Sequence, residues 1–374
     1  MIYLDSAATS LQKPGSVGEA MLRALHQCAS PGRGVHAPAM RAAEIAFRCR
    51  EEAAALFHMP DPGKVVFTHN ATHGLNIAIH SIVSPGMRVM VSGFEHNAVM
   101  RPLYALKAEI LVAEAPLFDP ERTIESFRRL LPGAGAAVCT HVSNVFGYRL
   151  PIYEIAGMCR EYGVPLIIDA AQSAGTEDLD FPRTGAAFCA MPGHKGLLGP
   201  QGTGILLCGD SGKPLMFGGT GGESERHDMP EELPDRLEAG TLNICGLAGL
   251  LEGIRYVRRR SPRALERKES QLLKELKDGL TGMHGLRLYS DDKAQRGILS
   301  VVPENISCEE LAERLNRFGI AVRAGLHCAP LAHISAGTIA TGTVRMSVSP
   351  FNTEEEIRTA VDRLEKILKM RNKM

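Results

Sequence analysis

The 374-residue chain contains no tryptophan, and aromatic residues make up only 5% of it. It also lacks an excess of either charge, because 42 lysine and arginine residues balance 42 aspartate and glutamate residues. A neutral chain without a basic run gives no electrostatic reason to bind nucleic acid. We therefore predict no nucleic-acid partner.

No apolar run reaches the length of a membrane span, and the start Met1–Asp5 has no basic leader before an apolar stretch. The nine cysteines are widely spaced, without a C-x-x-C pair. This spacing argues against a zinc ribbon, a thioredoxin-type motif and the disulfide framework of a secreted protein. We expect a cytoplasmic protein with no membrane association and no metal site, in which most cysteines are small buried residues.

Nucleotide-binding motifs are missing as well. No G-x-G-x-x-G follows a predicted strand, and Gly212-Lys213 lacks the spacing of a P-loop. Hydrophobic residues nevertheless form 44% of the chain, enough for a large core, and the length suits two domains. The glycine-rich composition is typical of an α/β protein.

The middle of the chain alternates short apolar runs with helical patterns. Helices are expected to begin near Thr72 and after Glu95, and a third over Ile152–Tyr162. The predicted strands are Val65–Phe67, Arg88–Val91, Ala137–Thr140, Val164–Ile168 and Gly204–Leu207. Such alternation predicts a mostly parallel sheet covered by helices on both faces, with ligands beyond the carboxyl ends of the strands.

Near residue 255 the pattern changes. We predict Arg255–Arg260 as the exposed start of a long charged helix that continues through Leu265–Leu280, and Gly218–Pro234 as an exposed loop. The later predicted elements are strands at Gly297–Val302, Ala321–Arg323 and Thr343–Val348 and helices at Cys308–Arg317 and Glu354–Met370. The expected division is a large domain at residues 15–255 and a smaller α+β domain at residues 1–14 and 256–374.

Lys195 lies in a loop of small residues, Pro192–Gly204, between two short apolar runs. Burial disfavours the charge of a lysine, and a desolvated lysine is a nucleophilic amine suited to imine chemistry. An exposed lysine beside a hairpin fits the same segment. The segment alone leaves both interpretations open.

Asp169 ends the predicted strand Val164–Ile168, where a carboxylate would point into a site at the sheet edge. Pyridoxal phosphate needs such a carboxylate to keep its ring nitrogen protonated, and Gln172 could reach the phenolate oxygen of the ring. A helix N-cap is the alternative role for Asp169.

Three further segments follow predicted strands. Ala71 and Thr72 open a helix, where backbone N–H groups favour a phosphate, although an ordinary threonine cap is the alternative. His96 could stack on a flat heterocycle or be a polar loop residue. Asn144 could donate to the phenolate oxygen or shape a turn. The coincidence of all five segments at strand ends predicts a pyridoxal-phosphate site.

These segments resemble pyridoxal-phosphate enzymes of fold type I in the class V aminotransferase group, and most closely the cysteine desulfurase and selenocysteine lyase family. The resemblance extends from Tyr3–Ala8 to Arg345–Thr353. It implies pyridoxal 5'-phosphate as the cofactor and a smaller C-terminal domain beside the large one, with Lys195 as the Schiff-base lysine. The other cofactor-binding residues that it implies are Ala71, Thr72, His96, Asn144, Asp169, Gln172, His194 and Thr241.

By the same resemblance, Thr241 matches a residue that, in members of this family, reaches the cofactor phosphate of the neighbouring subunit. This match implies a homodimer whose active sites are shared between the subunits. Pro192 stands where relatives often have a serine. The hydroxyl contact that this serine makes to the phosphate is therefore absent or replaced here.

Cys328 lies in a loop after a predicted strand, beside His327 and near Arg323. Cationic neighbours favour the thiolate form of a cysteine, whereas a buried structural cysteine is the alternative. The segment resembles the R-x-G-H-H-C-A motif of the second group of cysteine desulfurases, with Leu326 in place of the first histidine. The resemblance implies that Cys328 accepts sulfur as a persulfide.

Arg345 matches the arginine that binds the substrate carboxylate, for which a planar guanidinium is suited; a surface charge on a strand is the alternative. Arg323 and Asn144 are further predicted substrate-binding residues, and Lys195, Cys328 and His96 are the predicted catalytic residues. Lys195 would remove the Cα proton.

The sequence thus predicts a cysteine desulfurase that converts L-cysteine to L-alanine and passes a persulfide to an acceptor, which could be a protein. Alternatives that keep the cofactor are a selenocysteine lyase, a cysteine-sulfinate desulfinase, or an aminotransferase or epimerase of the same group. A non-catalytic scaffold or sulfur-binding partner is the alternative from another class. It predicts purified protein without yellow absorbance.

Overall fold

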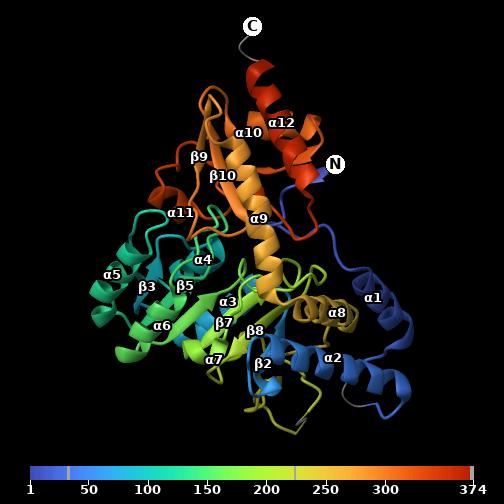
Figure 1. Ribbon diagram of the computed structural model, residues 1–374. Helices are drawn as coiled ribbons and strands as arrows, with labels where there is room; N and C mark the ends of the chain where they lie inside the picture. The colour runs from blue at the N-terminus through green and yellow to red at the C-terminus, as the bar shows by residue number, and fades with distance from the viewer. Residues whose placement is uncertain (32–33, 223–224, 371–374) are drawn as a thin grey trace.

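The computed structural model describes residues 1–31, 34–222 and 225–370. Its larger part is built on a seven-stranded sheet with the order β2-β8-β7-β6-β5-β3-β4 (Figure 1). The strands are β2 (Val65–Thr68), β3 (Arg88–Ser92), β4 (Glu109–Ala113), β5 (Ala136–Thr140), β6 (Leu166–Asp169), β7 (Phe188–Pro192) and β8 (Gly204–Cys208). Neighbouring strands are parallel except where β8 pairs with β2 and β7. The predicted mostly parallel sheet is confirmed, and β4 and β7 are additions to the predicted strands.

Helices cover both faces of this sheet, as predicted. Along β3, Val89 and Val91 pack in one apolar cluster with α3 (Ala71–Ile82) and α4 (Asn97–Ala105), whereas Met90 belongs to the cluster on the opposite face. The opposite face is covered by α2 (Ala37–Leu56), α5 (Pro120–Leu130), α6 (Ile152–Glu161), the short α7 (Phe181–Thr184) and α8 (Ile244–Arg260), and α1 (Gly15–Gln27) packs on α8. Burial on both faces explains why the strands are apolar throughout.

The C-terminal part has its own core around a four-stranded antiparallel sheet in the order β12-β13-β10-β9. Its elements are α9 (Pro262–Leu280), β9 (Leu286–Tyr289), β10 (Ile298–Pro303), α10 (Cys308–Arg317), β11 (Ile320–Ala321), β12 (Arg323–Gly325), α11 (Pro330–Ser335), β13 (Thr343–Ser347) and α12 (Glu354–Met370). The N-terminal β1 (Ile2–Tyr3) pairs in parallel with β11, so the start of the chain lies among the C-terminal elements (Figure 1). The smaller antiparallel C-terminal sheet agrees with the predicted fold class; the division at residues 14 and 255 stays a prediction.

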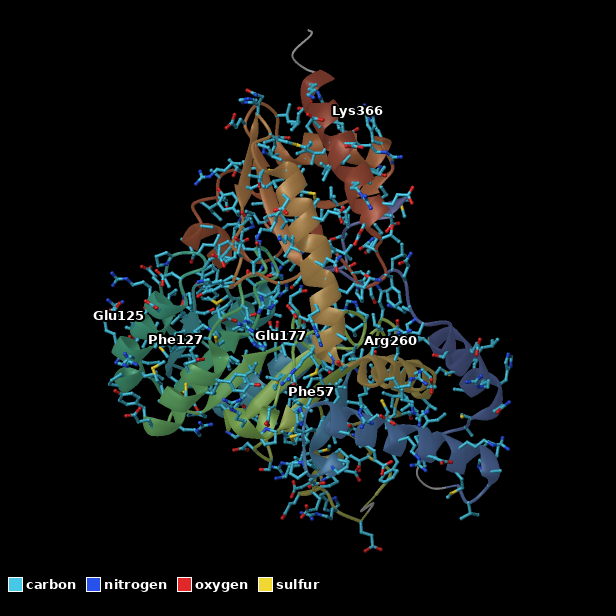
Figure 2. All side chains as sticks on the ribbon, viewed as in Figure 1. Phe57, Glu125, Phe127, Glu177, Arg260 and Lys366 are labelled. Atoms are coloured by element: carbon cyan, nitrogen blue, oxygen red, sulfur yellow. The ribbon has the colours of Figure 1, made fainter. Side chains whose placement is uncertain are left out.

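The prediction that Arg255–Arg260 begins the long charged helix is wrong. These residues end α8, whose buried apolar residues start upstream at Ile244, and Arg260 lies at its end (Figure 2). Ser261 breaks the helix with a positive φ of 62°, accepts a hydrogen bond from the Ala264 N–H, and is followed by Pro262 at the first position of α9. The charge run is therefore a helix C-terminus, where arginines oppose the negative end of the dipole.

The helix α9 joins the two parts. Leu265 packs in the core of the large sheet, whereas Leu272 and Leu276 pack in the C-terminal core. Arg296 Nε lies 3.5 Å from Glu266 Oε1 of α9 and 2.7 Å from Oε1 of Glu177, which belongs to the larger part. Figure 2 shows where Glu177 lies. The apolar contacts of α9 with both cores and the ion pairs of Arg296 thus hold the two parts together.

The predicted loop Gly218–Pro234 contains no helix or strand in its described residues; residues 223–224 lie outside the described part of the chain. It is mostly exposed, although Met229 and Pro230 are buried. Across residues 1–31, 34–222 and 225–370, no helix combines the length and the apolar character needed to span a bilayer.

Candidate active site

A cavity with about 520 Å³ of free space lies at the carboxyl ends of β5, β6 and β7. The starts of α3 and α4 form its other walls. It brings together the predicted cofactor residues Ala71, Thr72, His96, Asn144, Asp169, Gln172, His194 and Lys195. The rule that ligands sit beyond the carboxyl ends of parallel strands thus places this pocket correctly.

Lys195 follows β7 in a tight turn, in which its carbonyl oxygen accepts a hydrogen bond of 2.9 Å from the Leu198 N–H. The turn requires glycine at position 193, because a Cβ there would lie 2.1 Å from Thr203 Oγ1. The lysine side chain lines the cavity, and burial lowers its pKa to about 8 against the opposing charge of Asp169. At pH 7 about a tenth of this amine is therefore unprotonated and nucleophilic, far more than for a lysine with the ordinary pKa.

Asp169 is buried at the end of β6, and its Oδ1 accepts a hydrogen bond of 2.9 Å from the Ala171 N–H. This bond closes a turn. The described residues that follow, 170–180, contain no helix, so the alternative role of Asp169 as a helix N-cap does not apply. Burial raises the pKa of Asp169, whereas the Ala171 N–H and the charge of Lys195 lower it. Gln172 lies in the same turn and donates to the Ala7 carbonyl at 3.0 Å, which joins the N-terminal segment to the cavity wall.

His96 caps α4, and its Nδ1 accepts a hydrogen bond of 3.0 Å from the Ala98 N–H. Burial, together with the charge of Lys195, lowers the pKa of His96 to about 4. The ring is therefore neutral near pH 7, and because Nδ1 is an acceptor, the proton is on Nε2. A neutral, half-buried imidazole with a fixed orientation is a suitable stacking partner for a flat ring.

The start of α3 is capped by Asn70, whose side chain accepts a hydrogen bond of 2.9 Å from the His73 N–H. The threonine-cap alternative is therefore wrong. Ala71 and Thr72 occupy the first two positions of the helix, where backbone N–H groups have no partner within the helix. These donors and the positive end of the dipole open onto the cavity, an arrangement suited to a phosphate.

The N-terminal segment holds the lysine loop from the other side, which the sequence did not reveal. The His194 ring contacts Thr9 Oγ1 at 3.0 Å, and the His194 carbonyl accepts from both the N–H and the hydroxyl of Ser10. Burial lowers the pKa of His194 to about 4, so this ring is neutral. The contact pairs residues 185 positions apart, which no local pattern encodes.

Arg345 is only 2% exposed, so the surface-charge alternative is wrong. Its Nη2 lies 2.7 Å from Asp5 Oδ1, and its Nη1 donates to the Asn144 carbonyl at 2.9 Å. Its Nε is buried without a hydrogen-bond partner among the described residues. Arg323 is the cross-strand neighbour of Arg345 and is exposed. Two of the five N–H donors of the guanidinium are thus used within the protein, and three, including the one on Nε, remain.

Cys328 is the exposed member of the nine free cysteines, so it is not a buried structural cysteine. It forms a turn after β12 in which His327 and Cys328 both have positive φ, at 48° and 57°. The Asn97 N–H donates to the Cys328 carbonyl at 2.7 Å, and Asn144 Nδ2 donates to the His327 carbonyl at 2.8 Å. The turn is therefore fastened to residues next to His96 and in the cavity wall.

His327 does not contribute a cationic neighbour to Cys328, contrary to the expectation from the sequence. Its ring is buried and contacts Thr343 at 3.1 Å, and burial lowers its pKa to about 3. Thr241 is exposed and lies outside the lining of the lysine cavity of its own chain.

The fold and the site define a two-part α/β protein with a lysine of lowered pKa in a cavity at the carboxyl edge of its large sheet. The family model described as Aminotransferase class-V matches residues 2–359, and the chain belongs to this family.

Named relatives agree along the whole chain. The probable cysteine desulfurase of Methanothermobacter thermautotrophicus is 33% identical, covering 99% of this chain and 95% of the relative. The one of Pyrococcus abyssi is 31% identical, with 99% and 94% covered. Among solved structures, the apo cysteine desulfurase of Thermococcus onnurineus has a TM-score of 0.91 at 30% identity, with 98% and 94% covered. The fold and the family predicted from the sequence are confirmed.

Proposed function

We propose that pyridoxal 5'-phosphate binds in the lysine cavity and is attached to Lys195 Nζ. When bound, this cofactor supplies an electron sink that weakens the bonds at the Cα of an amino acid. The chain meets three chemical demands of the group: a buried carboxylate at Asp169, unpaired N–H donors at Ala71 and Thr72, and a lysine with a lowered pKa. The family match supports the same cofactor.

The remaining cavity residues suit the rest of the cofactor. His96 offers its neutral ring as a stacking surface, and His194, which lines the cavity next to Lys195, would contact the phosphate. Asn144 and Gln172 each use one amide hydrogen within the protein, to the His327 and Ala7 carbonyls. The second hydrogen of each amide remains to be donated to a ring oxygen.

We propose further that the substrate is L-cysteine and that the reaction is a desulfuration. The spare donors of Arg345 bind the substrate carboxylate, with Arg323 and Asn144 nearby. The Lys195 amine takes the Cα proton. The Cys328 thiolate attacks the substrate sulfur, the carbon–sulfur bond breaks, and the sulfur stays on Cys328 as a persulfide while L-alanine leaves. The persulfide then passes to an acceptor thiol.

One observation supports this proposal most strongly. Cys328 is exposed, yet its turn is held by two hydrogen bonds: the Asn97 N–H donates to the Cys328 carbonyl at 2.7 Å, and the side-chain amide of Asn144 donates to the His327 carbonyl at 2.8 Å. The turn that carries the thiol is therefore held against the cavity wall, although Cys328 is not among the residues that line the cavity, and its exposure leaves it open to an acceptor. The names of the relatives, which are cysteine desulfurases, point the same way.

The test measures L-alanine and sulfide together after L-cysteine is added to the purified protein with a thiol reductant. We expect equal amounts from the wild type, neither product from Cys328→Ala, and neither from Lys195→Ala. Cys245→Ala is the matched control, because Cys245 is partly exposed on α8 and away from the cavity lining. Full turnover of cysteine by Cys328→Ala would favour a selenocysteine lyase, a cysteine-sulfinate desulfinase or another class V reaction.

We also propose a homodimer in which Thr241 contacts the cofactor phosphate of the partner subunit. Thr241 is exposed and is not among the residues that line the cavity of its own chain, which is consistent with this role. Mixing Thr241→Ala with Lys195→Ala protein should restore activity, because one site of each mixed dimer then holds both residues. If the mixture were no more active than the amount of Thr241→Ala protein that it contains, the shared site would be contradicted.

A further inference from the structure

Glu95 is a fully buried carboxyl group immediately before His96. Its Oε1 accepts two hydrogen bonds, from Ser92 Oγ at 2.5 Å and from the Thr140 N–H at 2.8 Å. Its Oε2 is buried and has no hydrogen-bond partner among the described residues. Glu238 differs, because its carboxylate is paired with both terminal nitrogens of Arg50 at 2.8 and 2.6 Å.

The two bonds of Glu95 join strand ends that carry the site. Ser92 is the last residue of β3, and Thr140 is the last residue of β5. Thr140 is in turn the cross-strand partner of Asp169 on β6. A single carboxyl oxygen thus fixes the spacing between the segment that leads into His96 and the strand beside Asp169.

The surroundings of Glu95 do not suit a negative charge. The ionisable groups that act on it from the neighbouring strands are Asp169 on β6 and the Cys139 thiol on β5, and neither can be a cation. An unpaired carboxylate in such a place is strongly disfavoured by the loss of its hydration. Burial raises the pKa of Glu95 to about 8, and Asp169 adds to this shift.

We propose that Glu95 is a positioning residue that acts as a neutral carboxylic acid: it holds the ends of β3 and β5 together under the cavity and leaves Asp169 as the anion there. A second negative charge at Glu95 would raise the cost of ionising Asp169, which has to stay charged beside the cofactor ring nitrogen. This role deepens the proposed cofactor site and rests on it. The charge state of Glu95 can nevertheless be measured without turnover.

The test is the thermal unfolding of wild type and Glu95→Gln as a function of pH. Glutamine keeps the acceptor oxygen and the shape but has no proton to lose. Because the pKa of Glu95 is raised above its ordinary 4.5 in the folded protein, its contribution to stability is fully present below that pH and is lost as pH rises toward about 8. Glu95→Gln should therefore be close to wild type at about pH 5, where most of this contribution is still present, and should have the higher Tm at about pH 9.

Glu238→Gln is the matched control, since it makes the same change at a buried but paired carboxylate. It removes the ion pair with Arg50, so its Tm should lie below that of wild type at both pH values. If Glu95→Gln behaved in the same way, or did not fold, the neutral-acid role would be overturned.

Retention of the cofactor gives the second readout. Glu95→Gln should keep its visible absorbance and its turnover close to wild type at neutral pH, whereas Glu95→Ala, which removes both hydrogen bonds, should lose cofactor on dialysis. Cofactor retention in Glu95→Ala equal to that of wild type would overturn the positioning role. If no variant and no wild type bound the cofactor, the proposed function would fail, while the pH dependence of Tm would still decide the charge of Glu95.

Discussion

The substitution Arg345→Lys tests the proposal that Arg345 binds the carboxylate of the substrate. Arg345 has five N–H donors, of which one is used by Asp5 and one by the Asn144 carbonyl. A lysine ammonium has three donors and lacks the planar fork. If two of the three replace the existing bonds, a single donor remains for the substrate carboxylate. A lysine preserves the charge next to Asp5, so the ion pair is not simply broken.

The expected loss follows from one hydrogen bond to a charged group, which is worth about 1.5–3 kcal/mol. Since about 1.4 kcal/mol corresponds to a factor of ten, kcat/KM for L-cysteine should fall about 10-fold to 150-fold. Most of the loss should be in KM, because the carboxylate is bound before and during the reaction alike. The assay is the initial rate of L-alanine formation over a range of L-cysteine concentrations.

Arg50→Lys is the matched control for that experiment, because Arg50 is also a buried arginine in an ion pair, but its partner is Glu238 and it contacts neither Asp5 nor the cavity residue Asn144 in the described hydrogen bonds. It should lower Tm and leave KM unchanged. An unchanged kcat/KM in Arg345→Lys, or an equal rise of KM in both variants, would refute the assignment of Arg345 to the substrate carboxylate.

Three further predictions follow from the pKa shifts and the cavity wall. In cofactor-free protein, Lys195 should react with an amine-reactive reagent with a midpoint near about pH 8, and a midpoint near its ordinary 10.5 would contradict its burial. Pro192→Ser should slow the loss of cofactor on dilution about tenfold, because a hydroxyl at this wall position adds one bond to a phosphate; an unchanged loss of visible absorbance would place the phosphate elsewhere. Burial lowers the pKa of His141 to about 3, so the unfolded chain binds a proton that the folded chain does not as pH falls below 6.5. The Tm of His141→Asn should therefore fall less than that of wild type between about pH 7 and about pH 4. An equal fall of Tm in both proteins, measured by circular dichroism, would contradict this.

The strands and helices that were predictable are those with a complete local signal. Cys308–Arg317 and Glu354–Met370 have a continuous helical period and capped starts, and both form over the predicted residues. β4 at Glu109–Ala113 is an edge strand whose residues are mostly half-buried, so its apolar pattern is weak. The reversed direction of β8 could not be predicted, because the apolar pattern of a strand does not depend on its direction.

The same distinction applies to the site. Lys195, Asp169 and His96 each follow a strand, and one rule about sheet edges brings them together. Asp5, in contrast, meets Arg345 across 340 positions of sequence, and it is recognisable only once the N-terminal segment is seen among the C-terminal strands. In the sequence, Glu95 looks like a loop residue beside a histidine. Its burial and its two hydrogen bonds are seen only in the structure. Contacts that depend on tertiary structure have no local signature.

The central claim is that Cys328 takes sulfur from L-cysteine. Its most direct test is mass spectrometry of the peptide that contains Cys328, after the protein is incubated with L-cysteine without reductant and its thiols are alkylated. The account predicts that this peptide gains the mass of one sulfur atom in wild type and Cys245→Ala, and gains none in Lys195→Ala. An unmodified Cys328 peptide in protein that releases alanine from cysteine would contradict it.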